Sequence, residues 1–151
     1  MKIYKKILIG TDGSHDANNA ADRAAELQKE WKSDIVIFHS INHHKLLKTI
    51  YPETTLPLEV IQNIEDLSRK AGKEILKKTE LVFDKSLSLV ETRLIEDLSP
   101  EDYILKAVNH ENFDLVVIGS KGHHSKIKHI FHGTISTHIL REAPCDVLIV
   151  R

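Results

Sequence analysis

The segment best suited to binding an anion is IGSKGHHSKIKHIFHGT, from Ile118 to Thr134. Gly119 and Gly122 allow the backbone to approach a ligand without interference from a Cβ atom. Gly133 and Thr134 open the last predicted helix, and a helix N-terminus offers free N–H groups and a positive dipole end. These features predict a phosphate site, which we interpret as a nucleotide site. The alternative is that the glycines only shape turns.

Cationic side chains fill the same segment. It contains four histidines and three lysines, and the lysines are Lys121, Lys126 and Lys128. The lysines would add positive charge near a phosphate, and one or two histidines, His123 among them, would contact it. The alternative is that these side chains are solvated. No carboxylate lies within the segment, so we expect no dedicated metal site there.

Apolar runs and helical patterns alternate along the chain, which predicts a parallel sheet with helices on both faces. Strands are expected at 5–10, 34–41, 86–95, 114–119 and 146–150. Helices are expected at 17–31, from Pro57 to about Leu76, at 100–110 after a Ser99 cap, and at 134–142. The segment 43–57 is predicted to be a loop.

The predicted fold is one α/β domain, 1–151, with an open five-stranded sheet of order 3-2-1-4-5. Ligands bind such sheets beyond the carboxyl ends of the strands, where the strand order reverses. The reversal falls between the first and fourth strands. Their ends are Gly10–Ser14, GTDGS, and Ile118–Gly122, IGSKG, and both contain glycine. Topology and composition therefore indicate the same site.

Asp12 ends the first strand and would face this crevice. Its carboxylate could accept hydrogen bonds from a ribose hydroxyl or an adenine amine, or help to hold Mg²⁺ beside phosphates. The alternative is that Asp12 caps the following helix or stabilises a turn, and Ser14 competes for the cap.

Bulk properties exclude several other classes. The chain has 151 residues and a formal charge of −1, so no basic field suggests nucleic-acid binding. The single cysteine, Cys145, excludes a disulfide framework. No apolar run approaches the roughly 20 residues that span a bilayer. We expect a cytoplasmic protein without membrane contact.

The residues together resemble the universal stress protein family of the UspA type over nearly the whole chain. The likeness begins with KKILIGTDGS, continues through VIFHSI and VVIGSKG, and ends with APCDVLIVR. The ATP motif of that family is G-x2-G-x9-G-[ST]. Gly119, Gly122 and Gly133-Thr134 match it, but ten residues separate Gly122 from Gly133, one more than the motif has.

The resemblance implies a homodimeric switch that binds ATP or AMP, with Mg²⁺ possible through Asp12. It implies no catalytic residue and at most slow ATP hydrolysis. The dimer would form through the last strand, Asp146–Val150. The implied nucleotide-binding residues are Gly10, Thr11, Asp12, Ser40, Ile41, Ile118, Gly119, Lys121, Gly122, His123, Gly133, Thr134 and Ile135.

Other functions remain open. The longer spacing leaves open a dimeric stress scaffold that binds no nucleotide. Enzymes of the related α-hydrolase-like class need H-x-G-H or S-G-G-x-D-S after the first strand, and TDGSHD is neither. A phosphoacceptor receiver could use Glu96 and Asp97, but DVLIV is not followed by the lysine loop that receivers have.

Overall fold

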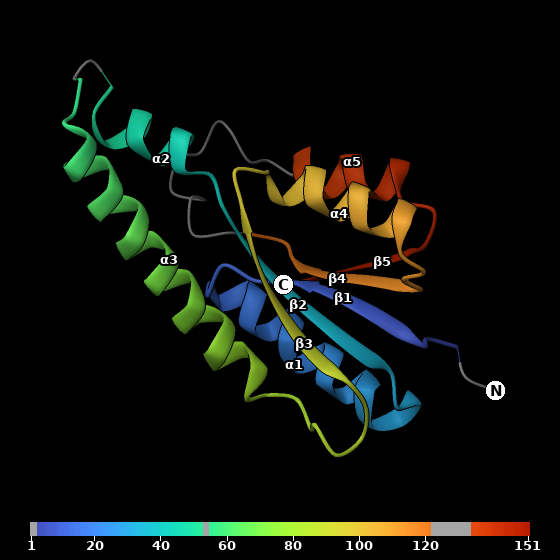
Figure 1. Cartoon of the computed structure of the whole chain (residues 1–151). Coiled ribbons are helices and arrows are strands. Elements are labelled where there is room, and N and C mark those ends of the chain that lie inside the picture. The colour runs from blue at the N-terminus through green and yellow to red at the C-terminus, as the bar shows by residue number, and fades with distance from the viewer. Residues whose placement is uncertain (1–2, 53–54, 122–133) are drawn as a thin grey trace.

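The protein is an open five-stranded parallel sheet between two layers of helices (Figure 1). The computed structural model describes residues 3–52, 55–121 and 134–151, and only the backbone of 134–136. The sheet order is β3-β2-β1-β4-β5, so the predicted order is confirmed. The strands are β1 (Lys6–Gly10), β2 (Asp34–Ile41), β3 (Val90–Glu96), β4 (Leu115–Gly119) and β5 (Asp146–Val150).

The helices cover both faces of the sheet (Figure 1). One face carries α1 (His15–Trp31) and α3 (Leu58–Glu80), and the other carries α4 (Pro100–His110) and α5 (Thr134–Glu142). A short helix, α2 (His43–Ile50), follows β2 and lies beside α3. Helices on both sides bury the central strands, which is why β1 and β4 are almost wholly aliphatic.

Side-chain alternation divides the interior into two cores. Ile7 and Ile9 point to the α1 side, where small alanines such as Ala20 and Ala24 let the helix lie close to the sheet. Leu8 points to the other side and packs with α4. The alanine-rich face, from which the sequence predicted this helix, therefore sets the distance between α1 and β4.

Side-chain caps define where two helices begin. Ser14 accepts a hydrogen bond from the Ala17 N–H at the start of α1. Ser99 does the same for the Asp102 N–H, with Pro100 as the first residue of α4. The predicted start of α4 at Ser99-Pro100 is confirmed.

Two predictions of local structure were wrong. The segment expected to be a loop from 43 contains α2, because Asn42 caps it by accepting from the Lys45 N–H. The third strand was expected from Ser86 but begins at Val90. The carboxylate of Asp84 accepts from both the backbone and the hydroxyl of Ser86, and this turn keeps the chain out of the sheet.

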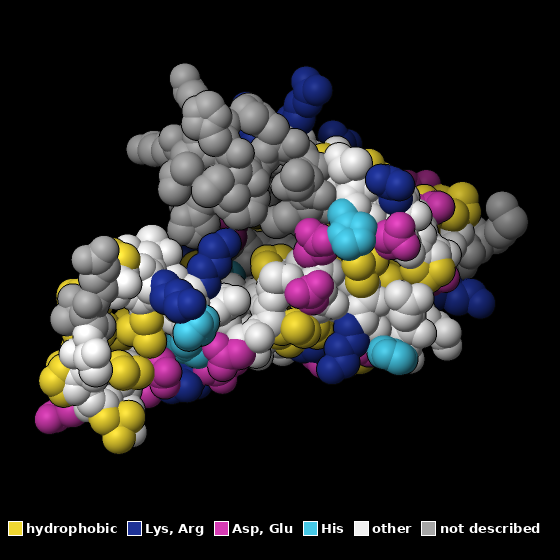
Figure 2. All heavy atoms as spheres, turned by 90° about the horizontal axis from the view of Figure 1, so that it is seen from above, with side chains coloured by type: hydrophobic (Ala, Val, Ile, Leu, Met, Phe, Trp, Pro, Cys, Tyr) yellow, Lys and Arg dark blue, Asp and Glu magenta, His cyan; other side chains and the backbone are white. Residues whose placement is uncertain are grey.

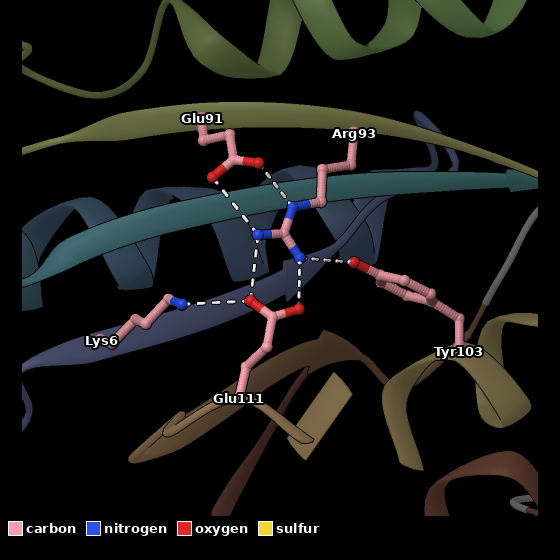
Figure 3. A network of polar contacts seen from close by, with 5 residues as sticks. All are labelled: Lys6, Glu91, Arg93, Tyr103 and Glu111. Carbon is pink, nitrogen blue, oxygen red and sulfur yellow. Dashed lines mark hydrogen bonds and ion pairs between the residues drawn. The ribbon is translucent and has the colours of Figure 1, made fainter. Parts of the chain in front are cut away.

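Arg93 organises the outer edge of the sheet (Figure 3). Its guanidinium donates to Glu91, to both carboxylate oxygens of Glu111 at 2.7 and 3.0 Å, and to the hydroxyl of Tyr103 at 3.0 Å. The Lys6 ammonium lies 3.1 Å from the same Glu111. Arg93 and then Lys6 hold the pKa of Glu111 below its usual range, against the opposing effect of burial. The network joins β3, β1 and the end of α4.

We predict that Glu111→Gln lowers the free energy of unfolding by about 1 kcal/mol at neutral pH. A carboxyl group whose folded pKa is depressed stabilises the fold above its unfolded pKa, about 4.3. That stabilisation disappears as the pH falls through the folded pKa. The difference in free energy of unfolding between parent and variant should therefore disappear in acid. Urea denaturation from pH 7 to about pH 3 measures it.

The control is Glu26→Gln, which removes the exposed pair with Arg23 and should change stability much less. A difference for Glu111→Gln that stays constant with pH would contradict the electrostatic account.

Candidate functional site

Hydrogen bonds join the carboxyl ends of β1 and β4 through the start of α1. The Ser14 hydroxyl donates to the carbonyl of Lys121 at 3.3 Å, and the Ser120 hydroxyl donates to the Asp16 carboxylate at 2.7 Å. The two segments that the sequence indicated from topology therefore lie together at one edge of the sheet. Asp16 and Ser120 were not predicted to belong to the site. Asp16 could have been singled out from the sequence, because it is an acidic residue in the first turn of a predicted helix.

Asp12 stabilises the turn between β1 and α1. Its Oδ1 accepts from the Ser14 N–H at 2.9 Å, and Gly13 takes a left-handed φ of 76°. Ser14 takes the helix cap, as the alternative interpretation expected. The structure thus gives Asp12 a role in the turn, and its contact with a nucleotide stays a prediction.

Gly119 lies against the backbone of α1. A Cβ atom there would sit 2.7 Å from both the Ala17 nitrogen and the Asp16 carbonyl carbon. No larger residue fits without moving the helix. The absence of a side chain at Gly119 therefore allows α1 to pack, whether or not a phosphate also approaches.

Three of the residues that the resemblance implies for nucleotide binding, Gly10, Ser40 and Ile41, fall on two faces of the sheet. A Cβ on Gly10 would lie 3.2 Å from the Phe38 ring and 3.5 Å from Ile118, on the α4 side. Ser40 also points to that side and donates to the carbonyl of Leu98. The Ile41 side chain points to the opposite side, toward Gly72 of α3. The two neighbours Ser40 and Ile41 cannot both present side chains to one face of an adenine ring.

Thr11 follows β1 directly and is buried, with 6% of its surface exposed. Its hydroxyl lies 3.4 Å from that of Thr79, and its carbonyl lies 2.8 Å from Nδ1 of His39. His39 also lies close to Gly72, so it faces α3 as expected for a strand residue beside a helix. Thr11 is therefore a structural contact between β1, β2 and α3, which the sequence did not reveal.

Several predicted site residues lie outside the described part of the chain. They are Gly122, His123 and Gly133. Thr134 and Ile135 are described only as the first backbone positions of α5. Lys121 is exposed at the end of the described segment, directly beyond β4.

A second polar cluster lies where β3 ends. Nε2 of the buried His43 is 2.8 Å from Glu96, and Arg69 donates to the same carboxylate at 2.6 Å. The hydrogen bond from His43 and then that from Arg69 hold the pKa of Glu96 below its usual range. Nδ1 of His43 is buried and has no partner among the described residues. The cluster attaches α2 and α3 to the sheet, and the sequence did not predict it.

A half-open hollow of about 310 Å³ lies between β3 and α4, lined by Leu98, Tyr103 and Lys106 among others. None of the residues predicted to bind nucleotide lines it. In the described ranges, no group of three or more His, Cys, Asp or Glu side chains could hold a metal ion. No helix among the described residues is long and apolar enough to cross a bilayer.

The strand order and the helices on both faces define an open, doubly wound α/β fold. The universal stress protein family model matches residues 3–151, and the chain belongs to that family. It is 34% identical to a putative universal stress protein of Staphylococcus aureus (strain USA300), over 100% of this chain and 86% of that protein.

Solved structures show the same fold. The UspA universal stress protein of Lactobacillus plantarum superposes with a TM-score of 0.76, at 20% identity and 98% coverage of both chains. A universal stress protein of Archaeoglobus fulgidus in complex with dAMP gives a TM-score of 0.63, at 20% identity and 99% coverage of both chains. A universal stress protein in complex with cAMP gives 0.64 at 20% identity, covering 99% of this chain and 98% of that one.

We predict that Gly119→Ala destabilises the protein by about 1–3 kcal/mol, because the methyl group overlaps backbone that only a shift of α1 can relieve. Gly10→Ala is the matched control. Its methyl would meet a side-chain ring at 3.2 Å, so the expected loss is below about 1 kcal/mol. Thermal and urea unfolding without ligand measure both. Equal stability of the two variants would show that α1 does not depend on the absence of a side chain at Gly119.

Proposed function

We propose that this universal stress protein binds an adenine nucleotide, ATP or AMP, in the crevice between β1 and β4 and acts as a homodimeric switch. The observation that carries the proposal is the convergence of Gly10–Asp12 and Gly119–Lys121 at the point where the strand order reverses. Relatives of the same fold, solved with cAMP and with dAMP, support an adenine nucleotide as the ligand class.

Within this proposal, the phosphates lie toward the N-terminus of α5 and the loop that precedes it. Thr134 begins that helix, and the N–H groups of a first helical turn can bind an anion. The lysine at 121 and the motif glycines Gly122 and Gly133 would complete the phosphate side. Asp12 would meet the ribose or a bound Mg²⁺. The family resemblance implies no catalytic residue, and the proposed role is therefore binding, with at most slow hydrolysis.

A dimeric scaffold without nucleotide is the second candidate, and specific contacts favour it. Gly119 is explained by the close approach of α1, and Asp12 is explained by the turn to Ser14. The phosphate loop is also one residue longer than the family motif. Each of these features is compatible with a fold that keeps its shape after losing its ligand.

Calorimetry decides between the two candidates. We expect nucleotide-free parent protein to bind Mg-ATP or AMP with saturation, and Gly122→Val to lose this binding because its side chain would fill the phosphate side. Asp12→Asn should weaken binding while keeping the turn, because an amide oxygen still accepts from the Ser14 N–H. Absence of binding heat from the parent at two temperatures would favour the scaffold.

The proposed dimer forms through β5, which is an edge of the sheet. The side chains from Val147 to Val150 are all apolar and half-buried. At the opposite edge, β3 carries the charged residues Glu91 and Arg93, which protect against pairing with another strand. An apolar edge invites pairing and a charged edge opposes it, so β5 is the edge suited to a symmetric contact.

We predict that Leu148→Lys abolishes association through β5, because a two-fold contact would bury the new charge twice. Analytical ultracentrifugation should show a lower mass than for the parent. Because Leu148 also packs against the core on the α1 side, circular dichroism must show that the variant is folded at the temperature used. An unaltered dimer with this variant would place the interface elsewhere.

A further inference from the structure

The first turn of α1 lies directly on the chain that leaves β4. A Cβ atom on Gly119 would sit 2.7 Å from the carbonyl carbon of Asp16, so the two backbones are in contact. From the same turn, the Asp16 carboxylate accepts a hydrogen bond from the Ser120 hydroxyl at 2.7 Å. The two residues are 104 positions apart in the sequence, and neither is among the residues that the family resemblance implies for nucleotide binding.

Ser120 is held from two sides. Its N–H donates to the carbonyl of Val150 at 2.8 Å, which continues the ladder between β4 and β5. Its hydroxyl donates to Asp16. Serine has one N–H and one O–H to donate, so both donors of Ser120 are engaged within the protein and neither is offered to a phosphate. Ser120 can therefore serve a ligand only through the course that it gives to the backbone entering Lys121.

The bond to Asp16 is the stronger of two side-chain contacts between the start of α1 and this segment. The other joins the Ser14 hydroxyl to the carbonyl of Lys121 at 3.3 Å, which is long for a hydrogen bond. The bond to Asp16 is shorter, and an ionised acceptor roughly doubles the strength of a hydrogen bond. Removing the Asp16 carboxylate would therefore release the chain beyond β4 from its principal polar contact with α1.

The charge of Asp16 argues against direct contact with a phosphate. A helix N-terminus attracts anions, but at α1 this end is already supplied with the protein's own oxygens. Asp12 accepts from the Ser14 N–H, Ser14 accepts from the Ala17 N–H, and the Asp16 carboxylate lies in the first turn. The first turn of α5, by contrast, contains no acidic residue. Phosphates are therefore better placed at α5, and Asp16 would act on them through Ser120.

Charges are mixed over the described surface of the α4 and α5 side. Cationic and acidic side chains lie interspersed there, without a wide patch of either sign (Figure 2). The orientation of a bound phosphate would therefore depend on the groups closest to it, and on how firmly the protein holds them.

We propose that Asp16 is a positioning residue of the nucleotide site, which holds Ser120 and so fixes the backbone from Gly119 to Lys121 against which the nucleotide lies. The inference rests on the proposed function, because it assigns Asp16 a part in binding the same nucleotide. Asp16 does not touch the ligand, and it acts through the hydroxyl of Ser120.

The test compares Asp16→Ala with Asp16→Asn by calorimetry, with Mg-ATP and with Mg-free AMP. Neither variant carries the charge, and only the asparagine keeps an oxygen that accepts from Ser120. We expect Asp16→Ala to bind both nucleotides about tenfold more weakly than Asp16→Asn, which should bind at least as tightly as the parent. Weaker binding of Mg-ATP alone would assign Asp16 to the metal ion and overturn the proposal.

Two further variants separate position from stability. Ser120→Ala removes the donor of the same bond, so it should weaken binding as Asp16→Ala does, and the double variant should lose little more. The matched control is Asn19→Ala, on the next turn of α1, which removes a hydrogen bond of 3.1 Å to the carbonyl of Arg151 at the end of β5. It should lower the midpoint of urea unfolding about as much as Asp16→Ala does, with nucleotide binding unchanged.

A measurement without nucleotide tests the contact itself. Exchange of the Ser120 amide hydrogen in the ligand-free protein should be about tenfold faster in Asp16→Ala than in Asp16→Asn. Equal exchange rates, or equal affinities of these two variants, would overturn the positioning role while the proposed nucleotide binding stands. If the parent binds neither nucleotide, the proposed function fails, and the positioning role falls with it.

Discussion

The close approach of α1 to β4 is the constraint on which the candidate site depends. Gly119 has no Cβ, so the Ala17 nitrogen can lie where a side chain would otherwise be. That contact places Ser14 and Asp16 within hydrogen-bonding distance of the chain that leaves β4. The alanines of α1 act in the same direction because they keep the helix close to the sheet along its length.

The sequence predicted the layers and strand order well, because those depend on patterns that extend over many residues. Runs such as LVVIG, which are apolar at every position, occur only where both faces of a strand are covered. Short elements were harder to predict from the sequence. Helix α2 depends on a single Asn42 cap, and the late start of β3 depends on one turn at Asp84, so neither leaves a periodic signal.

The sequence predicted correctly that two segments lie together, and a nucleotide between them stays a prediction. The prediction brought together Gly10–Ser14 and Ile118–Gly122, and the described residues of both segments do lie at one edge of the sheet. It could not show which atoms a side chain at Gly10 or Gly119 would contact. Those contacts depend on how Phe38 and α1 pack against the two glycines in the folded protein. That Ser40 and Ile41 point to opposite faces follows from the alternation of side chains along a strand, so the predicted strand at 34–41 already implied it. The buried His43 with its partners Glu96 and Arg69 comes from three segments far apart in the chain, so no spacing reveals it.

One continuous segment of the chain, from the end of β4 through α5 to β5, links the candidate site to the proposed dimer edge. The chain leaves β4 at the crevice, returns through α5 and ends in β5. A ligand held at the start of α5 would act on the helix that precedes the edge strand, and α5 contacts β5 directly. The proposed switch therefore needs no distant coupling, since the ligand and the interface share one continuous segment.

The most direct test of a nucleotide in the crevice is an amide chemical-shift titration of ¹⁵N-labelled protein with Mg-ATP and with AMP. The account predicts saturable chemical-shift changes at the amides of Gly10–Gly13 and Gly119–Lys121. The amides of the N-terminal half of α3, from residue 58 to 68, should change little. Shifts confined to the hollow beside α4, or no saturable shift with either nucleotide, would contradict it.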